Sequence, residues 1–169
     1  MSTTAAVGLD EFLQARPRLF RIACRIVGNP HEAEELVQDV WLRWQRTDRA
    51  AVTDPQAFLA TAVSRLAINV VQSARRRYET CAGPLLPDER AAGGVDPHTL
   101  AEHREAFDAA VHLLRDRLSP AERATYVLRE GYEYPYRQIA ETLRIGTPNA
   151  RQLVKRARDR LGQQAVRPL

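Results

Sequence analysis

The chain is poor in several features whose absence excludes whole classes of protein. Among 169 residues there are two cysteines, Cys24 and Cys81, whose separation fits neither a disulfide framework nor a zinc-ligand spacing. No apolar run approaches the roughly 20 residues that span a bilayer. The N-terminus lacks the charged start and apolar stretch of a signal peptide. We therefore expect a cytoplasmic protein with no membrane partner.

Catalytic and cofactor signatures are scarce as well. The four histidines are scattered, and His103 and His112 do not share a metal-ligand spacing. No nucleophile motif or phosphate-binding loop occurs in the sequence. An enzyme is therefore the least favoured interpretation, and we predict no catalytic residue, no metal site and no cofactor.

Charge is present, and it is unevenly placed. Residues 1–80 hold 11 basic and 9 acidic residues (+2), residues 81–135 hold 6 and 10 (−4), and residues 136–169 hold 8 and 2 (+6). These parts sum to the net charge of +4. A basic end of this kind suggests a polyanionic partner.

Helix-start signals dominate the rest of the pattern. Five prolines directly follow a good N-cap residue, in Asn29-Pro30, Asp54-Pro55, Asp96-Pro97, Ser119-Pro120 and Thr147-Pro148. A cap side chain accepts a bond from an orphan backbone N–H, and proline at the first helical position has no N–H to lose. Glu122 completes a capping box with Ser119. Because strand alternation is not evident, these signals predict an all-α fold.

The predicted helices form two small domains joined by a linker. The first domain, residues 8–80, is a three-helix unit, and Pro17 is expected to bend or interrupt its first helix. Residues 81–97 are rich in glycine and proline and predict a flexible linker. The second domain covers residues 98–169. The expected helices run over about 9–27, 30–46, 55–77, 97–118, 120–129, 136–143 and 148–162.

The last two helices have the pattern of a helix-turn-helix, with Gly146 allowing the turn and Thr147 capping the second helix. A major groove accepts such a helix, since arginine or lysine can address guanine and glutamine or asparagine can address adenine. Charge alone fits a solvated helix end equally well, but the turn in front favours DNA binding. The expected outward residues are Asn149, Arg151, Gln152, Lys155, Arg156, Arg158 and Arg160.

Two further polar surfaces lie in the first domain. The helix that starts at Pro30 opens with an acidic run, which suits a helix N-terminus and explains the run as far as Glu35. The preference for acidic residues at a helix N-terminus explains Gln38 and Asp39 less well, because they lie further along the helix. The helix that starts at Pro55 has a polar side ending in three arginines, which a solvated face would also explain. This side comprises Thr61, Ser64, Arg65, Asn69, Gln72, Arg75, Arg76 and Arg77.

The order of these features resembles the extracytoplasmic-function (ECF) class of bacterial RNA polymerase sigma factors. The matching stretches are residues 25–44, 55–69, 118–130 and 136–158. The resemblance implies a sigma region 2 domain at residues 8–80 and a sigma region 4 helix-turn-helix domain at residues 98–169.

The linker resembles that of one ECF subgroup, which carries Gly-Pro-Trp-Leu-Pro-Glu-Pro and normally continues into a SnoaL-like domain. Leu85 stands at the tryptophan position and Glu89 at the final proline position. Since the sequence stops at Leu169, the resemblance leads us to expect that this additional domain is absent.

The resemblance also implies a partner for each polar surface. Clamp helices of the polymerase largest subunit would bind Glu35, Leu36, Gln38, Asp39 and Leu42. The melted minus-ten strand would meet Thr61, Ser64, Arg65, Asn69, Arg75, Arg76 and Arg77, the last three through phosphates. The minus-35 duplex would be read by Arg151, Gln152, Lys155 and Arg156. The flap of the second-largest subunit and an anti-sigma factor are further implied partners.

The predicted function is therefore that of a sigma factor, which binds core RNA polymerase and directs promoter-specific initiation. The main alternative is a stand-alone helix-turn-helix regulator. That alternative explains the C-terminal half but neither Gln38 and Asp39 nor the polar side from Arg65 to Arg77. Three tyrosines, Tyr132, Tyr134 and Tyr136, are most consistent with packing near the helix-turn-helix, and a polymerase contact is the other interpretation.

Overall fold

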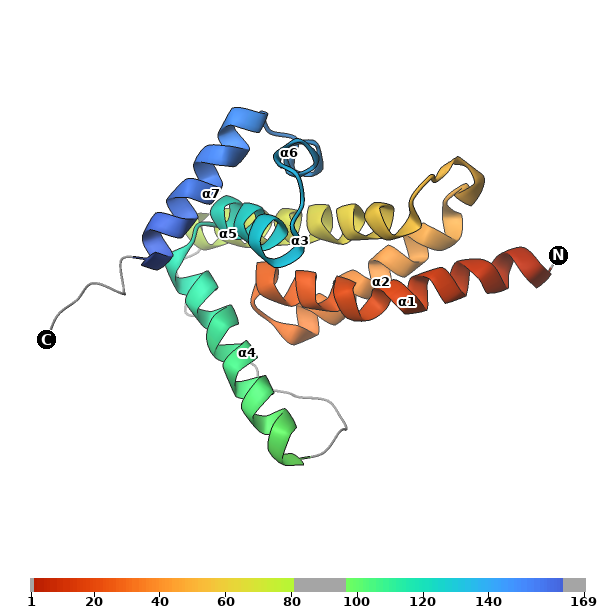
Figure 1. Ribbon diagram of the computed structural model, residues 1–169, viewed down its shortest axis with the longest axis horizontal. Coiled ribbons are helices and arrows are strands. Elements are labelled where there is room, and N and C mark those ends of the chain that lie inside the picture. Colours follow the sequence, from red (N-terminus) through yellow and green to blue (C-terminus); the bar gives the residue numbers. More distant parts are fainter. Residues whose placement is uncertain (1, 81–96, 163–169) are drawn as a thin grey trace, which may run out of the picture.

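The computed structural model describes the backbone of residues 2–80 and 97–162 and the side chains of residues 8–74 and 105–162. All regular structure within these ranges is helical, which confirms the all-α prediction (Figure 1). The predicted linker lies almost wholly outside the described residues. The elements are α1 (Ser2–Val27), α2 (Pro30–Arg46), the 3-10 turn η1 (Arg49–Ala51), α3 (Pro55–Thr80), α4 (Pro97–Arg117), α5 (Pro120–Tyr126), the π-helical turn η2 (Val127–Gly131), α6 (Tyr136–Leu143) and α7 (Thr147–Gly162).

The capping signals act as predicted at the starts of α2, α3 and α5. The Asn29 side chain accepts a hydrogen bond from the His31 backbone N–H at 2.9 Å. Asp54 accepts one from the Ala57 N–H at 3.0 Å. Ser119 and Glu122 form the reciprocal capping box, with distances of 3.3 and 3.0 Å. Each bond satisfies a backbone N–H that has no partner inside the helix.

Pro17 does not interrupt α1, which runs from Ser2 to Val27, and this proline is exposed between the buried Ala15 and Leu19. The prediction for the turn after α6 was wrong. The residue that reverses the chain there is Arg144, with φ of 55°, and not Gly146. A Cβ on Gly146 would meet only the Pro148 ring at an ordinary 3.7 Å, so the turn does not require glycine there.

One continuous core runs through both halves of the chain. The fully buried side chains of α1, α2 and α3 include Leu19, Trp44 and Leu59, and the same cluster extends to Leu128 and Ile139 of the C-terminal half. Figure 1 shows α5 and α6 beside α3, and contacts between these elements confirm this arrangement. The structure therefore places the two halves against each other.

The central helix α3 needs one further comment. Its stretch Pro55–Ala74 is long and apolar enough to cross a membrane by length and composition alone. The stretch is nevertheless interrupted by Ser64 and Arg65, and Leu59 and Val63 are fully buried. Because α3 packs against α1 and α2, we interpret it as the core helix of this bundle.

Candidate nucleic-acid interface

The outer face of α7 is open. Buried positions on the opposite side of the helix, such as Leu153 and Val154, hold it against α5 and α6. Among the described residues, no hydrogen bond or ion pair involves the polar side chains of this face. We call this surface the α7 face, and it consists of the four exposed residues predicted for minus-35 reading, Arg151, Gln152, Lys155 and Arg156.

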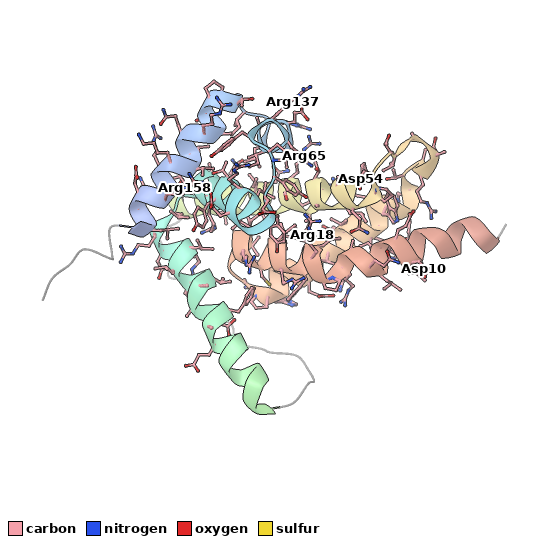
Figure 2. The ribbon with its side chains drawn as sticks, viewed as in Figure 1. Asp10, Arg18, Asp54, Arg65, Arg137 and Arg158 are labelled. Carbon is pink, nitrogen blue, oxygen red and sulfur yellow. The ribbon has the colours of Figure 1, made fainter. Side chains whose placement is uncertain are left out.

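Two other basic residues of α7, also predicted to point outward, have acidic partners instead. Arg158, which is labelled in Figure 2, forms an ion pair with Glu130 of η2. The hydrogen bond within this pair raises the pKa of the Arg158 guanidinium. Arg160 contacts Glu122 of α5 at 2.8 Å, and the Glu122 side chain is only 4% exposed. These pairs link the second half of α7 to α5 and η2.

The polar side of α3 is not open. Ser64 is completely buried, and its hydroxyl donates to the Ala60 carbonyl at 2.7 Å. Thr61 is half-buried, while Asn69 is exposed. The backbone of α3 continues through the three arginines at 75–77, whose side chains lie outside the described residues. The structure therefore does not gather the predicted minus-ten residues into one accessible face, and Ser64 belongs to the core.

Arg65 joins α3 to the helix-turn-helix. Its Nε donates to the Thr142 carbonyl at 2.9 Å, and a terminal nitrogen donates to the Glu141 carbonyl at 3.0 Å (Figure 2). Both carbonyls belong to the last turn of α6, where helix carbonyls lack intrahelical partners and carry partial negative charge. Arg65, which was predicted to contact DNA, therefore caps the C-terminal end of α6.

A second contact between the two halves involves α1 and the segment after η2. The guanidinium carbon of Arg18 lies 5.2 Å from the ring centre of Tyr132 and 5.7 Å from that of Tyr134. Arg25 adds a hydrogen bond to the Tyr132 hydroxyl at 3.5 Å. Burial raises the pKa of both tyrosines, so they remain neutral at pH 7. Tyr132 and Tyr134 therefore pack against α1 as well as near the helix-turn-helix.

The surface predicted to bind polymerase is largely exposed on α2. Its accessible members are Glu35, Gln38, Asp39 and Leu42, and Leu42 is 49% exposed. Their spacing of three or four residues places them on one side of the helix. We call these four residues the α2 surface. Leu36, predicted with them, is only 4% exposed and packs in the core, so it supports the helix from inside.

The described part of the chain contains no group of three or more histidine, cysteine, aspartate or glutamate residues placed to hold a metal ion. The one described cysteine, Cys24, is buried, and burial raises the pKa of its thiol to about 12. A thiol in this state is a poor nucleophile at neutral pH.

Comparison with known proteins defines first the class of molecule. Residues 12–77 match the family model for sigma-70 region 2, and residues 109–161 match the model for sigma-70 region 4. A helical region 2 followed by a helix-turn-helix region 4 is the arrangement that the fold displays.

Individual relatives narrow the class. The chain is 37% identical over 152 residues to the ECF RNA polymerase sigma factor SigJ of Mycobacterium tuberculosis, covering 89% of this chain and 48% of SigJ. It is 31% identical over 153 residues to a probable ECF sigma factor, SigI, of the same species, covering 89% and 53%. The chain belongs to the ECF family of RNA polymerase sigma factors, and it spans about half the length of these curated relatives.

Solved structures agree with this assignment. The crystal structure of M. tuberculosis SigJ matches with a TM-score of 0.65 and 33% identity, covering 90% of this chain and 52% of that one. The sigma factor RpoE of Bartonella quintana, solved with the anti-sigma factor NepR, matches with a TM-score of 0.68 over 94% of this chain and 97% of that one. At 19% identity, the second match supports the fold alone.

Proposed function

We propose that this chain binds core RNA polymerase and directs it to promoters. The observation that carries the proposal is the open α7 face, on the second helix of a helix-turn-helix, in a chain that also has a sigma region 2. The names of SigJ and SigI, which describe RNA polymerase sigma factors, support polymerase as the partner.

We assign separate tasks to the two halves. Region 2 is proposed to cover residues 8–80, the linker 81–97 and region 4 98–169. The matched family models lie inside these proposed limits. Joining two small DNA-binding modules raises the effective concentration of the second contact once the first has formed. Weak individual contacts can therefore give a tight holoenzyme–promoter complex.

The α7 face is proposed to read the minus-35 duplex in the major groove. Arginine can donate two parallel hydrogen bonds to guanine, and glutamine can pair with adenine. Gln152, Lys155 and Arg156 make no hydrogen bond or ion pair within the described structure, so base contact would break no existing polar interaction. This part of the proposal requires no rearrangement of region 4.

The α2 surface is proposed to dock on the clamp helices of the largest polymerase subunit. Asp39 and Gln38 make no hydrogen bond or ion pair in the described part of the chain, and Leu42 presents apolar area beside them. A central apolar contact surrounded by charge is a common interface design. Region 4 is proposed to contact the flap of the second-largest subunit.

The minus-ten surface requires the two halves to separate. Asn69, Arg65 and the arginines at 75–77 are proposed to meet the melted strand. Arg65 cannot serve DNA while its guanidinium is bonded to the carbonyls of Glu141 and Thr142. We therefore propose that polymerase holds regions 2 and 4 apart and thereby frees Arg65. Thr61, half-buried here, would become more accessible in the same step.

The proposed role is non-enzymatic. Extruding bases from a duplex costs a few kcal/mol, and binding to the unpaired strand would offset that cost. Catalysis of nucleotide addition would rest with polymerase, and the proposed place of action is the cytoplasm. An anti-sigma factor is a further proposed regulator, as the sequence resemblance to ECF sigma factors implies.

Core binding tests the proposal against the stand-alone regulator. Purified core polymerase is mixed with the wild-type chain, with the Gln38→Ala/Asp39→Arg double variant and with Glu105→Arg, a matched charge reversal at an exposed position of α4. We expect the wild type and Glu105→Arg to bind core and the double variant to lose binding while remaining helical. Tight operator binding together with no core binding by the wild type would establish the stand-alone regulator instead.

A further inference from the structure

Tyr136 lies between two arginines from different elements. The guanidinium carbon of Arg129, on η2, is 4.5 Å from the centre of the tyrosine ring. That of Arg151, on α7, is 5.7 Å from the same centre. Both distances lie within the range of about 6 Å over which a cation is attracted by an aromatic face. The first residue of α6 thus connects η2 to the α7 face.

The Arg129 end of this connection is anchored. A terminal nitrogen of Arg129 donates to the Tyr134 carbonyl at 3.0 Å, and the Tyr136 ring is itself half-buried. The ring therefore has a defined position before any ligand binds. Arg151 is exposed and makes no hydrogen bond or ion pair with the described residues, so the ring is the one polar or aromatic partner found for its guanidinium.

We propose that Tyr136 is a positioning residue that orients Arg151 for base reading. This inference rests on the proposed function, in which Arg151 contacts the minus-35 duplex. An arginine that reads guanine must present its planar fork to two acceptors, and its long side chain loses rotamer freedom in doing so. A ring that already restricts the guanidinium reduces this loss on binding.

The neighbouring readers provide an internal contrast. Lys155 and Arg156 are exposed on the same face, and within the described structure neither lies over an aromatic ring. Tyr136 should therefore affect discrimination at the base read by Arg151 and leave the bases read by its neighbours unchanged. A tyrosine hydroxyl that simply contacted a phosphate would instead weaken binding to all sequences alike.

A double-mutant cycle in the holoenzyme tests this inference. Binding is measured to a minus-35 duplex and to duplexes changed at one base pair, for wild type, Tyr136→Leu, Tyr136→Phe, Arg151→Ala and Tyr136→Leu/Arg151→Ala. The base read by Arg151 is the one whose discrimination the Arg151→Ala variant loses. At that base we expect Tyr136→Leu to reduce discrimination about two- to fivefold. Tyr136→Phe should retain it, and Tyr136→Leu should have no effect in the Arg151→Ala background.

Three results would overturn the inference: equal loss on every duplex, equal loss with Phe and Leu, or additive effects in the cycle. Should Tyr136→Leu unfold region 4 in a thermal melt, Arg129→Met removes the anchor while keeping the ring, and the same reduced discrimination is expected. Unchanged discrimination in that variant would count against the inference. A wild-type holoenzyme that discriminates at no minus-35 base would contradict the proposed function itself, which separates the two failures.

Discussion

The outer face of α7 and the polar side of α3 have similar patterns of polar and basic residues but different surroundings. Each presents polar and basic residues at helical spacing, and each was predicted to contact DNA. In the structure Lys155 and Arg156 of α7 remain open, whereas Ser64 of α3 is buried and Arg65 is bonded to α6. Polar periodicity therefore identifies a side of a helix but not what covers that side.

The difference arises from the number of neighbours. The helix α7 packs on α5 and α6, which leaves its other side in solvent. The helix α3 packs against α1 and α2 and also against α5 and α6. A helix enclosed in this way must bury some of its small polar residues, which then bond to their own backbone, as Ser64 does.

The largest expected effect is the difference in unfolding free energy between substitutions at Ser64 and at Asn69 of α3. The Ser64→Asp variant places a carboxylate in the core without a cationic partner and should lower the free energy of unfolding by about 3 kcal/mol or more. The Asn69→Asp variant, at an exposed position of the same helix, should change it by less than about 0.5 kcal/mol. Urea unfolding measures both, and similar effects at the two positions would show that Ser64 is accessible.

The α7 face is expected to give the next largest effect. Because Arg156 has no partner to lose within the described structure, Arg156→Ala should cost about 1–3 kcal/mol at a minus-35 site if its side chain bonds to a base. Competition binding with single-base variants of the duplex gives the comparison. An equal loss of affinity on every duplex would show that Arg156 contacts a phosphate and does not read a base.

The next prediction concerns the contact that Arg65 of α3 makes with α6. Removing its two hydrogen bonds in Arg65→Ala should weaken docking of regions 2 and 4 by about 1 kcal/mol, since the group is partly exposed. Fluorescence transfer between labels on the two regions of the free protein should then show a greater separation. Arg137→Ala is the matched control, because that arginine pairs with Glu141 within α6 alone. If both variants left the separation unchanged, the Arg65 contact would have no role in docking.

The smallest expected effect is a difference between Lys155 and Arg158 in how strongly DNA binding depends on salt. Lys155→Ala removes one positive charge from the α7 face and should reduce the slope of log binding constant against log salt by up to about 0.9. Arg158→Ala should reduce it less, because this arginine is already paired with Glu130. The reverse order would place the DNA on the Arg158 side of α7.

Local sequence signals predicted most of the helix starts. The caps at Asn29, Asp54 and Ser119 depend on residues within three positions of each other, so the sequence alone was sufficient. The four residues of the α7 face were predicted for a similar reason, since their exposure follows from apolar periodicity in one short helix.

Contacts between distant segments could not be predicted in this way. Arg65 meets α6 more than 70 positions later, and no pattern within α3 indicates this contact. The pairing of Arg158 with Glu130 and of Arg160 with Glu122 was likewise missed, since periodicity within α7 predicted only that these arginines point outward. The left-handed residue at Arg144 was missed because Gly146 nearby carried the more obvious turn signal.

Transcription by purified core polymerase with and without this chain tests the central claim most directly. With genomic promoter fragments as templates, we predict transcripts from defined start sites that appear only when both components are present. The Gln38→Ala/Asp39→Arg variant should abolish these transcripts. Specific operator binding by the free protein, with no defined start sites in the presence of core polymerase, would contradict the assignment.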